Sequence, residues 1–222
     1  ASRQAREFLS DNVVATNRLL SAAARFSPKA RNVIVGSSAE YGVSHSIRRR
    51  FNEGSVPGPK GWYGLSKHIQ TTFALRFADR TGIHLCIARP FNIIGPDISH
   101  ELFWGSLFGQ LRRKQNHVSL GTLSSIRDFI DVEDVCRGIF LIAEKGRDGR
   151  VYNICSGKGH SPGQIIEMTR RLSGLDFDVS VDAGKSRRGK DYQVGSNDRI
   201  RSELGWKPRI SMATSIRQSL TI

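Results

Sequence analysis

Residues 32–42 read Asn-Val-Ile-Val-Gly-Ser-Ser-Ala-Glu-Tyr-Gly, a short apolar run followed by a loop that begins and ends with glycine. This pattern is typical of a buried strand that ends in a polar turn. In an open parallel sheet, ligands bind at the carboxyl ends of the strands. We therefore expect Ser37 and Ser38 to stand at the mouth of a site, where their hydroxyls can contact a substrate oxygen. A solvated serine turn is the alternative.

A second motif, Tyr63-Gly64-Leu65-Ser66-Lys67, opens a helix that the apolar spacing predicts to run from Tyr63 to about Arg80. Residues four apart on a helix lie one turn apart on the same face. Phenol is a weak acid with a pKa of ~10, and a neighbouring ammonium lowers that pKa toward the range useful for proton transfer. The spacing also arises by chance on amphipathic helices, so a core tyrosine beside a solvated lysine is the alternative.

More motifs follow these two along the chain. A buried strand at residues 84–88 leads into Arg89-Pro90-Phe91-Asn92-Ile93-Ile94-Gly95-Pro96. Later segments are Arg127-Asp128-Phe129-Ile130-Asp131-Val132, Val151-Tyr152-Asn153-Ile154-Cys155-Ser156-Gly157 and Leu204-Gly205-Trp206-Lys207-Pro208. Together with the serine loop and the Tyr-Lys pair, these motifs resemble, in the same order, those of the extended short-chain dehydrogenase/reductase superfamily. That superfamily includes nucleotide-sugar epimerases, dehydratases and reductases.

The resemblance implies an α/β fold, namely an incomplete Rossmann-like doubly wound parallel sheet with a small C-terminal α/β substrate-binding lobe. Residues 1–97 and 126–155 would form the C-terminal half of the Rossmann-like domain, and residues 98–125 and 156–222 the lobe. Hydrophobic spacing and capping residues predict the other elements. These are helices at 3–26, 101–114, 132–144, 197–204 and 212–220, a helix starting at Ser161, and strands at 117–120, 151–155 and 177–181.

The resemblance also assigns catalytic roles. Tyr63 would be the general acid/base on a sugar oxygen, and Lys67 would lower the pKa of Tyr63 and bind the nicotinamide ribose. Ser37 would donate a hydrogen bond to the same oxygen, with Ser38 as a close alternative. Pro90 would pack near the nicotinamide. The implied cofactor is NAD or NADP.

Three residues are expected to bind the substrate. Asn92 would hydrogen-bond the sugar, although an Asx turn before Gly95 is its structural alternative. Arg127 and Arg188 would clamp the diphosphate, because planar forked donors match phosphate oxygens. Arg127 could instead be a strand-end charge paired with Asp128.

The residue at position 39 bears on the type of reaction. Dehydratases of this superfamily carry an acid two residues before the Tyr-Gly pair, and the chain has Ala39 there. Alanine cannot exchange a proton, and Glu40 is displaced by one position. We therefore expect reduction of a 4-keto nucleotide sugar such as GDP-4-keto-6-deoxymannose. A nucleotide-sugar 4-epimerase with bound NAD is the alternative within the same superfamily.

Composition adds an alternative of another class. The chain has 222 residues with 34 Lys plus Arg against 20 Asp plus Glu, a formal charge of +14. This charge is compatible with a degenerate, non-catalytic binding protein for polyanions. The basic residues are spread out without interleaved aromatics, so nucleic acid is not the expected partner.

The remaining composition points to a soluble, reduced environment. No apolar stretch approaches the ~20 residues that span a bilayer, so no membrane partner is expected. Cys86, Cys136 and Cys155 are scattered in apolar runs, which suggests buried, reduced thiols and a cytoplasmic location. The six histidines show no metal-ligand spacing, so no metal site is expected.

The N-terminal region carries two further expectations. In the superfamily, helices corresponding to 3–26 and 63–80 pair with copies from a second subunit, which implies a homodimer. A dinucleotide pyrophosphate needs a glycine-rich loop at a helix N-terminus, and no glycine occurs before Gly36. We therefore expect the chain to be a fragment of a larger enzyme whose preceding half supplies that loop, and expect the fragment alone to be inactive. A protein that has lost its cofactor half is the alternative.

Overall fold

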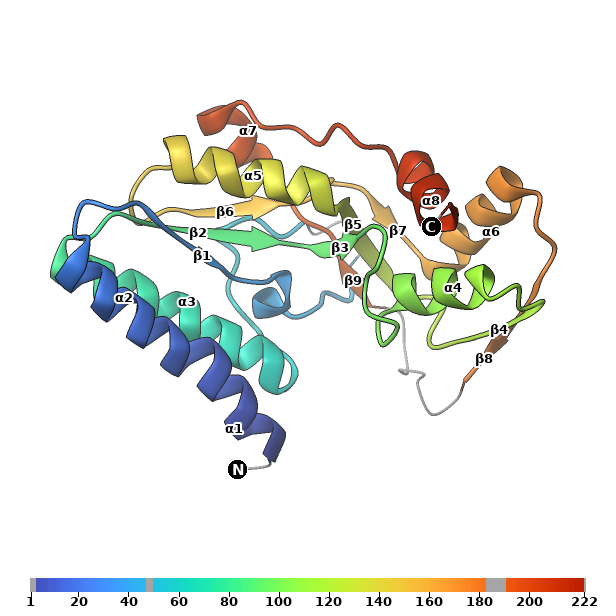
Figure 1. Ribbon diagram of the computed structural model, residues 1–222, viewed down its shortest axis with the longest axis horizontal. Coiled ribbons are helices and arrows are strands. Elements are labelled where there is room, and N and C mark those ends of the chain that lie inside the picture. Colours follow the sequence, from blue (N-terminus) through green and yellow to red (C-terminus); the bar gives the residue numbers. More distant parts are fainter. Residues whose placement is uncertain (1–2, 47–49, 183–190, 222) are drawn as a thin grey trace.

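The computed structural model describes residues 3–46, 50–182 and 191–221. Its centre is a three-stranded parallel sheet in the order β1-β2-β6. The strands are β1 Asn32–Val35, β2 Leu85–Pro90 and β6 Val151–Ile154. Helices cover both faces, with α2 and α3 on one face and α5 and α7 on the other (Figure 1). The predicted α/β class, with a parallel sheet between helical layers, is confirmed.

The helical layer of α1, α2 and α3 lies on one side of the sheet. The helix predicted at 3–26 is a continuous run of α1 Arg3–Leu9, a π-helical turn η1 Ser10–Val14, and α2 Ala15–Phe26. Helix α3, Gly61–Thr81, lies beside it (Figure 1). Small side chains let α3 approach the sheet closely. The buried residues of this layer are Leu20, Ile34, Ala74, Ala78, Ile83, Leu85 and Ile87.

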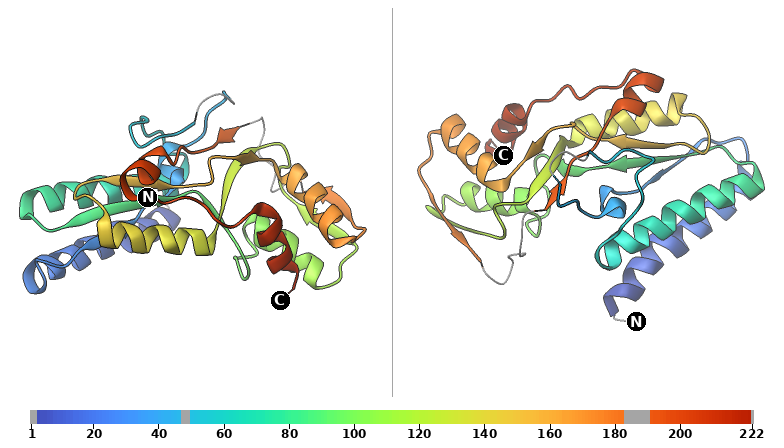
Figure 2. Two further views of the ribbon diagram at one scale, coloured as in Figure 1. Left: turned by 90° about the horizontal axis from the view of Figure 1, so that it is seen from above. Right: turned by 180° about the vertical axis from the view of Figure 1, so that it is seen from behind.

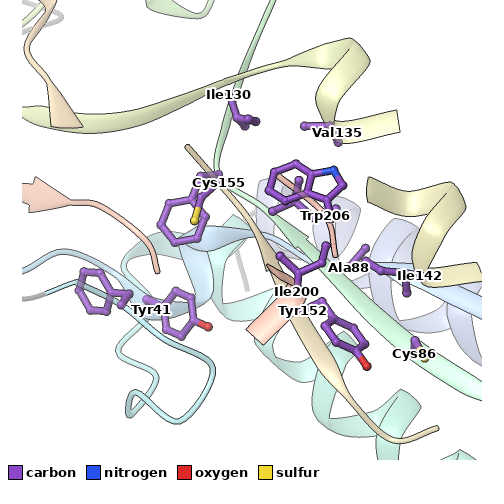
Figure 3. Close-up of a cluster of buried hydrophobic side chains, with 13 residues drawn as sticks. Tyr41, Cys86, Ala88, Ile130, Val135, Ile142, Tyr152, Cys155, Ile200 and Trp206 are labelled. Carbon is purple, nitrogen blue, oxygen red and sulfur yellow. The ribbon is translucent and has the colours of Figure 1, made fainter. Parts of the chain in front are cut away.

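The opposite face is packed by α5 Val132–Lys145 and α7 Asp198–Leu204. Trp206 follows α7 and lies in the hydrophobic cluster between these helices and the sheet (Figure 3). Gly138 of α5 makes this packing possible, because a Cβ there would lie 2.9 Å from Ile154 Cδ1 and 3.2 Å from Trp206 Nε1.

Further strands extend from the ends of the central sheet. β3 Asn92–Ile94 follows β2 and pairs in parallel with β5 Ile126–Asp131. β5 also pairs antiparallel with β7 Gly159–His160 and in parallel with β9 Tyr192–Gln193. These short pairings join the central sheet to the C-terminal elements.

The C-terminal elements have a second hydrophobic cluster. A two-stranded parallel sheet is formed by β4 His117–Leu120 and β8 Asp178–Val181. Helices α4 Phe103–Arg112, α6 Pro162–Ser173 and α8 Met212–Leu220 lie at the same end of the molecule (Figure 2). Their shared core consists of Trp104, Leu107, Phe108, Leu111, Val118, Leu120, Ile165, Ile166, Phe177 and Ile216, with Ile94 and Phe129 from β3 and β5.

The division of the chain into a Rossmann-like half and a lobe stays a prediction. The cluster of the C-terminal elements, separate from the clusters on the two faces of the central sheet, supports it. Ile200 and Trp206 fall in the range 156–222 but pack in the cluster below α5. Cys136 was expected to be buried and is exposed on α5, whereas Cys86 and Cys155 are buried. Among the described residues, no helix is long and apolar enough to cross a membrane.

Candidate active site

The serine turn begins where β1 ends. Ser37 caps the short 3₁₀ helix η2, Ser38–Tyr41, by accepting a hydrogen bond from Ala39 N at 3.2 Å. Ser37 N donates to Glu40 Oε1 at 2.9 Å, which completes a capping box. Within the described residues, the Ser37 hydroxyl hydrogen has no acceptor and can donate to a ligand. The hydroxyl of Ser38 is buried and donates to Gln193 Oε1 at 3.4 Å.

The Tyr-Lys pair lies on the first turns of α3. Lys67 Nζ donates to Val35 O, at the carboxyl end of β1, and to Gln70 Oε1, each at 3.0 Å. Tyr63 is 43% exposed, and its ring meets the Phe8 ring edge-on at 5.6 Å between centroids. The phenol is therefore accessible, while the ammonium one turn later is anchored at the strand end.

The start of α3 is pressed against the serine turn. A Cβ at Gly64 would lie only 2.7 Å from Ala39 O, so glycine permits this close approach. Burial lowers the pKa of the Lys67 ammonium, and the negative charge of Glu40 acts against that shift. Serine, tyrosine and lysine therefore come from segments that touch one another at the carboxyl end of β1.

Polar contacts with the preceding helix fix the register of α3. Gln70 Nε2 donates to Thr16 Oγ1 at 2.8 Å, and Asn12 Nδ2 donates to Ser66 Oγ at 3.0 Å. Because Gln70 also accepts from Lys67, the ammonium belongs to a network that reaches α2. Such side-chain networks hold their members in one arrangement when every partner is satisfied.

Glu40 is directed into the protein interior. Its carboxylate is fully buried and accepts from Arg89 Nη2 at 2.6 Å. The Arg89 guanidinium also lies over the Tyr41 ring, 4.6 Å from its centroid. A carboxylate engaged in this way has a structural role, which agrees with the expectation that Glu40 does not replace the acid missing at Ala39.

A cleft of about 620 Å³ lies between β3, β5 and α4, within the usual size range of small-molecule sites. Two of the predicted substrate-binding residues, Asn92 and Arg127, line it. Asn92 Nδ2 donates to Asp128 O at 3.0 Å, so the side chain bridges β3 and β5. The other lining residues include the aromatic side chains of Phe103, Trp104 and Phe129, together with Thr122 and Ser125.

The expected alternative partner of Arg127 is wrong. Arg127 Nη1 pairs with Asp191 Oδ1 at 2.8 Å, and both side chains are largely buried. The Asp128 carboxylate instead faces away from Arg127 and accepts hydrogen bonds from Ser156 N, Gly157 N and Gly195 N. Alternation along β5 explains the difference, because neighbouring side chains of a strand face opposite sides.

The predicted residues form two groups. Ser37 and Lys67 lie at the end of β1, with Tyr63 one helical turn before Lys67, and Asn92 and Arg127 line the cleft beyond β2. Pro90 is buried at the end of β2, between the two groups in the chain. Among the described residues, the cleft lining does not include the Tyr63 group. Arg188 lies outside the described residues.

Gln193 is a site residue that the sequence did not reveal. It lies in the two-residue strand β9, and its Nε2 donates to Ser38 O in the serine turn. A strand this short carries no period that could be recognised, and its pairing partners are distant in the sequence.

Comparisons with known proteins identify the family of the chain. Residues 1–155 match the model of the NAD dependent epimerase/dehydratase family. GDP-6-deoxy-D-mannose reductase of Pseudomonas aeruginosa is 28% identical over an alignment of 227 residues that covers 100% of this chain and 75% of that protein. GDP-6-deoxy-D-talose 4-dehydrogenase of Aggregatibacter actinomycetemcomitans is 28% identical over 211 residues, covering 94% and 70% of the two chains.

A solved structure gives the same result. RMD from Pseudomonas aeruginosa, complexed with NADPH, superposes with a TM-score of 0.88 at 27% identity and covers 96% of this chain and 73% of its own. Sequence motifs, sheet topology and the family match therefore agree. The chain belongs to the NAD-dependent epimerase/dehydratase family of extended short-chain dehydrogenases/reductases.

Proposed function

We propose that this chain carries the proton-transfer and substrate-binding residues of an enzyme that reduces a 4-keto nucleotide sugar with NADH or NADPH. The substrate would resemble GDP-4-keto-6-deoxymannose, in keeping with the reductase that is 28% identical. The observation that carries the proposal is the anchoring of Lys67 at Val35 O, one turn from the exposed phenol of Tyr63. In this arrangement an acid and its cation would stand beside Ser37, at a strand end.

Tyr63 would donate its proton to the ketone oxygen as that oxygen gains negative charge. Lys67 would stabilise the phenolate that remains, because a nearby cation favours the charged form of a phenol. Ser37 would donate its free hydroxyl hydrogen to the same oxygen and share the developing charge. When bound, the reduced nicotinamide supplies the hydride that the carbonyl carbon receives.

The residues present fit the nicotinamide-ribose part of such a cofactor. Among the described residues, Lys67 uses two of its three ammonium hydrogens on Val35 and Gln70, which leaves one for a ribose hydroxyl. Tyr63 is exposed on the same helical face, and Pro90 ends the neighbouring strand. These three residues would hold the ribose and pack against the ring.

The cleft lined by Asn92 and Arg127 would take the nucleotide-sugar part. Its aromatic walls suit the apolar faces of a base or sugar, and Arg127 offers a forked donor to the diphosphate. Arg127 would then exchange its contact with Asp191, wholly or in part, for phosphate oxygens. Arg188 stays a predicted second diphosphate ligand on the basis of the family motif.

Ala39 favours reduction over dehydration because no proton-exchanging side chain stands at that position. Stoichiometry separates reductase from epimerase. The full-length enzyme, with the preceding half that supplies the glycine-rich loop, would be incubated with GDP-4-keto-6-deoxymannose and NADPH or NADH, and oxidation of the nicotinamide followed by absorbance. We expect one cofactor to be oxidised per sugar reduced, with kcat lowered by about 10²-fold to 10⁴-fold in Tyr63→Phe. Interconversion of sugars without net cofactor consumption would identify an epimerase instead, and failure of the full-length protein to bind any dinucleotide would favour a non-catalytic binding protein.

We also propose that the protein forms a homodimer through α2 and α3. Leu19 is 57% exposed on α2, and Leu65 and Ile69 are both 36% exposed on α3. These apolar side chains lie on helices whose other faces pack against the sheet. Sedimentation of the wild type should give twice the chain mass, and Ile69→Asp should give the monomer, whereas Phe140→Asp on α5 should leave the dimer intact. A monomeric wild type would contradict this assignment.

A further inference from the structure

Strand β9 runs between the serine turn and the substrate cleft. Gln193 pairs in register with Arg127 of β5, and Tyr192 exchanges both backbone hydrogen bonds with Ser44, each at 2.8 Å. The β9 backbone is therefore held on two sides. Asp191, the residue just before β9, is the ion-pair partner of Arg127.

The side chain of Gln193 is directed to the serine turn. Its Nε2 donates to Ser38 O at 3.0 Å and to Gly42 O at 2.7 Å, and its Oε1 accepts from Ser38 Oγ at 3.4 Å. Gln193 is buried, so water does not compete for these bonds. Its amide thus joins the two ends of η2.

The contact with Ser38 O has a direct consequence for Ser37. Ser38 O and Ala39 N belong to one planar peptide unit, so holding the oxygen also holds the N–H. That N–H is the donor to Ser37 Oγ. Because the Ser37 oxygen accepts from a fixed donor, its own hydrogen is directed elsewhere, toward a ligand.

We propose that Gln193 is a positioning residue, which orients the Ser37 hydroxyl by fixing the Ser38–Ala39 peptide. This inference rests on the proposed function, in which Ser37 donates to the ketone oxygen. Gln193 acts through Ser37 and touches neither substrate nor cofactor. Its loss should therefore slow the chemical step and leave substrate binding unchanged, since backbone bonds hold β9 beside Arg127.

The test compares Gln193→Leu with Gln110→Leu, a matched control. Gln110 also joins two backbone segments with its amide, because Nε2 donates to Ser119 O at 3.1 Å and Oε1 accepts from Ser119 N at 3.0 Å. We expect Gln193→Leu to lower kcat by about 10-fold to 100-fold, with KM for the nucleotide sugar within about threefold of wild type. Gln110→Leu should lose stability but keep kcat.

A double-mutant cycle with Ser37→Ala then identifies the route of the effect. If Gln193 acts through Ser37, adding Gln193→Leu to the Ser37→Ala variant should lower kcat by less than about twofold. An equally large loss in both backgrounds would overturn the proposal. So would a Gln193→Leu variant with wild-type kcat, or one whose defect lies wholly in KM.

A measurement without catalysis distinguishes this inference from the proposed function. Amide hydrogen exchange across residues 37–42 should become about tenfold faster or more in Gln193→Leu and stay unchanged in Gln110→Leu. Unchanged exchange in Gln193→Leu would overturn the role of Gln193 whether or not the protein is active. If the full-length enzyme is inactive but shows the exchange response, the proposed function is contradicted, and the ordering of the turn by Gln193 stands.

Discussion

Arg89 and Glu40 form an ion pair in the interior, with Nη2 and Oε2 2.6 Å apart and the two side chains 5% and 0% exposed. The pair joins the end of β2 to the serine turn, because Glu40 is also the residue that closes the capping box on Ser37. Gly36 is required beside it, since a Cβ there would lie 2.5 Å from Glu40 Oε1. The position of the serine turn therefore depends on a buried charge pair as well as on backbone hydrogen bonds.

Breaking this pair should be strongly destabilising. Arg89→Met leaves the Glu40 carboxylate buried without its cation, and we expect a loss of about 3–5 kcal/mol in the free energy of unfolding, measured with denaturant. Glu40→Gln combined with Arg89→Met should recover part of the loss. Arg3→Met is the control, because the pair of Arg3 with Glu7 is exposed and should contribute less than about 1 kcal/mol. A similar loss at both sites would contradict the prediction.

Removing the phenol hydroxyl should affect catalysis far more than stability. Tyr63→Phe keeps the ring that contacts Phe8 but removes the proton, so we expect kcat to fall by about 10²-fold to 10⁴-fold. The melting temperature should hardly change, because Tyr63 is substantially exposed and, among the described residues, its side chain makes only the ring contact with Phe8. Steady-state kinetics and thermal unfolding of the same samples test both halves. Retained activity would show that another group transfers the proton.

Elements with clear local signals could be predicted from the sequence. The helices predicted from the apolar spacing of residues 3–26 and 63–80 are present as α1–α2 and α3. Ser161 caps α6 in a capping box with Gln164, as the Ser-Pro-Gly-Gln pattern predicts. Gly205 ends α7 with a φ of +71°, a conformation that glycine adopts without strain.

Features that depend on distant partners could not be predicted. The carboxylate of Asp134, in the first turn of α5, is buried and accepts from Arg209 N and Ile210 N, which lie far along the chain. Strands β3, β7 and β9 are only two or three residues long and exist because β5 pairs with them. The family motifs named Arg127, but its pairing with Asp191 required the fold to bring β5 and the start of β9 together.

Arg127 should contribute directly to nucleotide binding. Replacing it with Met removes a charge-assisted donor that is worth about 1.5–3 kcal/mol, so GDP should bind about 10-fold to 150-fold more weakly in calorimetry. Arg112→Met is the control, because Arg112 does not line the cleft. Its ion pair with Asp97 is a loose one, with Nη1 and Oδ1 3.9 Å apart. Equal GDP affinities for wild type and Arg127→Met would mean that the diphosphate does not bind in this cleft.

Asp128 should give the protein an unusual pH dependence of stability. Its carboxyl is fully buried, and burial raises its pKa from 3.8 to about 6, although the N–H donors of Ser156, Gly195 and Gly157 act in the opposite direction. Between pH 3.8 and about 6 the folded state then binds more protons at this site than the unfolded state. The stability that Asp128 contributes is therefore complete below the lower value and is lost as the pH rises through the higher one.

The comparison of wild type with Asp128→Asn isolates this effect. The difference in unfolding free energy between the two should shrink as the pH rises from about 4 to about 6, by up to roughly 3 kcal/mol at ~1.4 kcal/mol per pKa unit. Asp178→Asn, at an exposed position, controls for the loss of one acidic group. A difference that grows with pH would mean that the hydrogen bonds to the carboxylate outweigh its burial. In that case the ionised form of Asp128 would be the one that holds Ser156, Gly157 and Gly195 together.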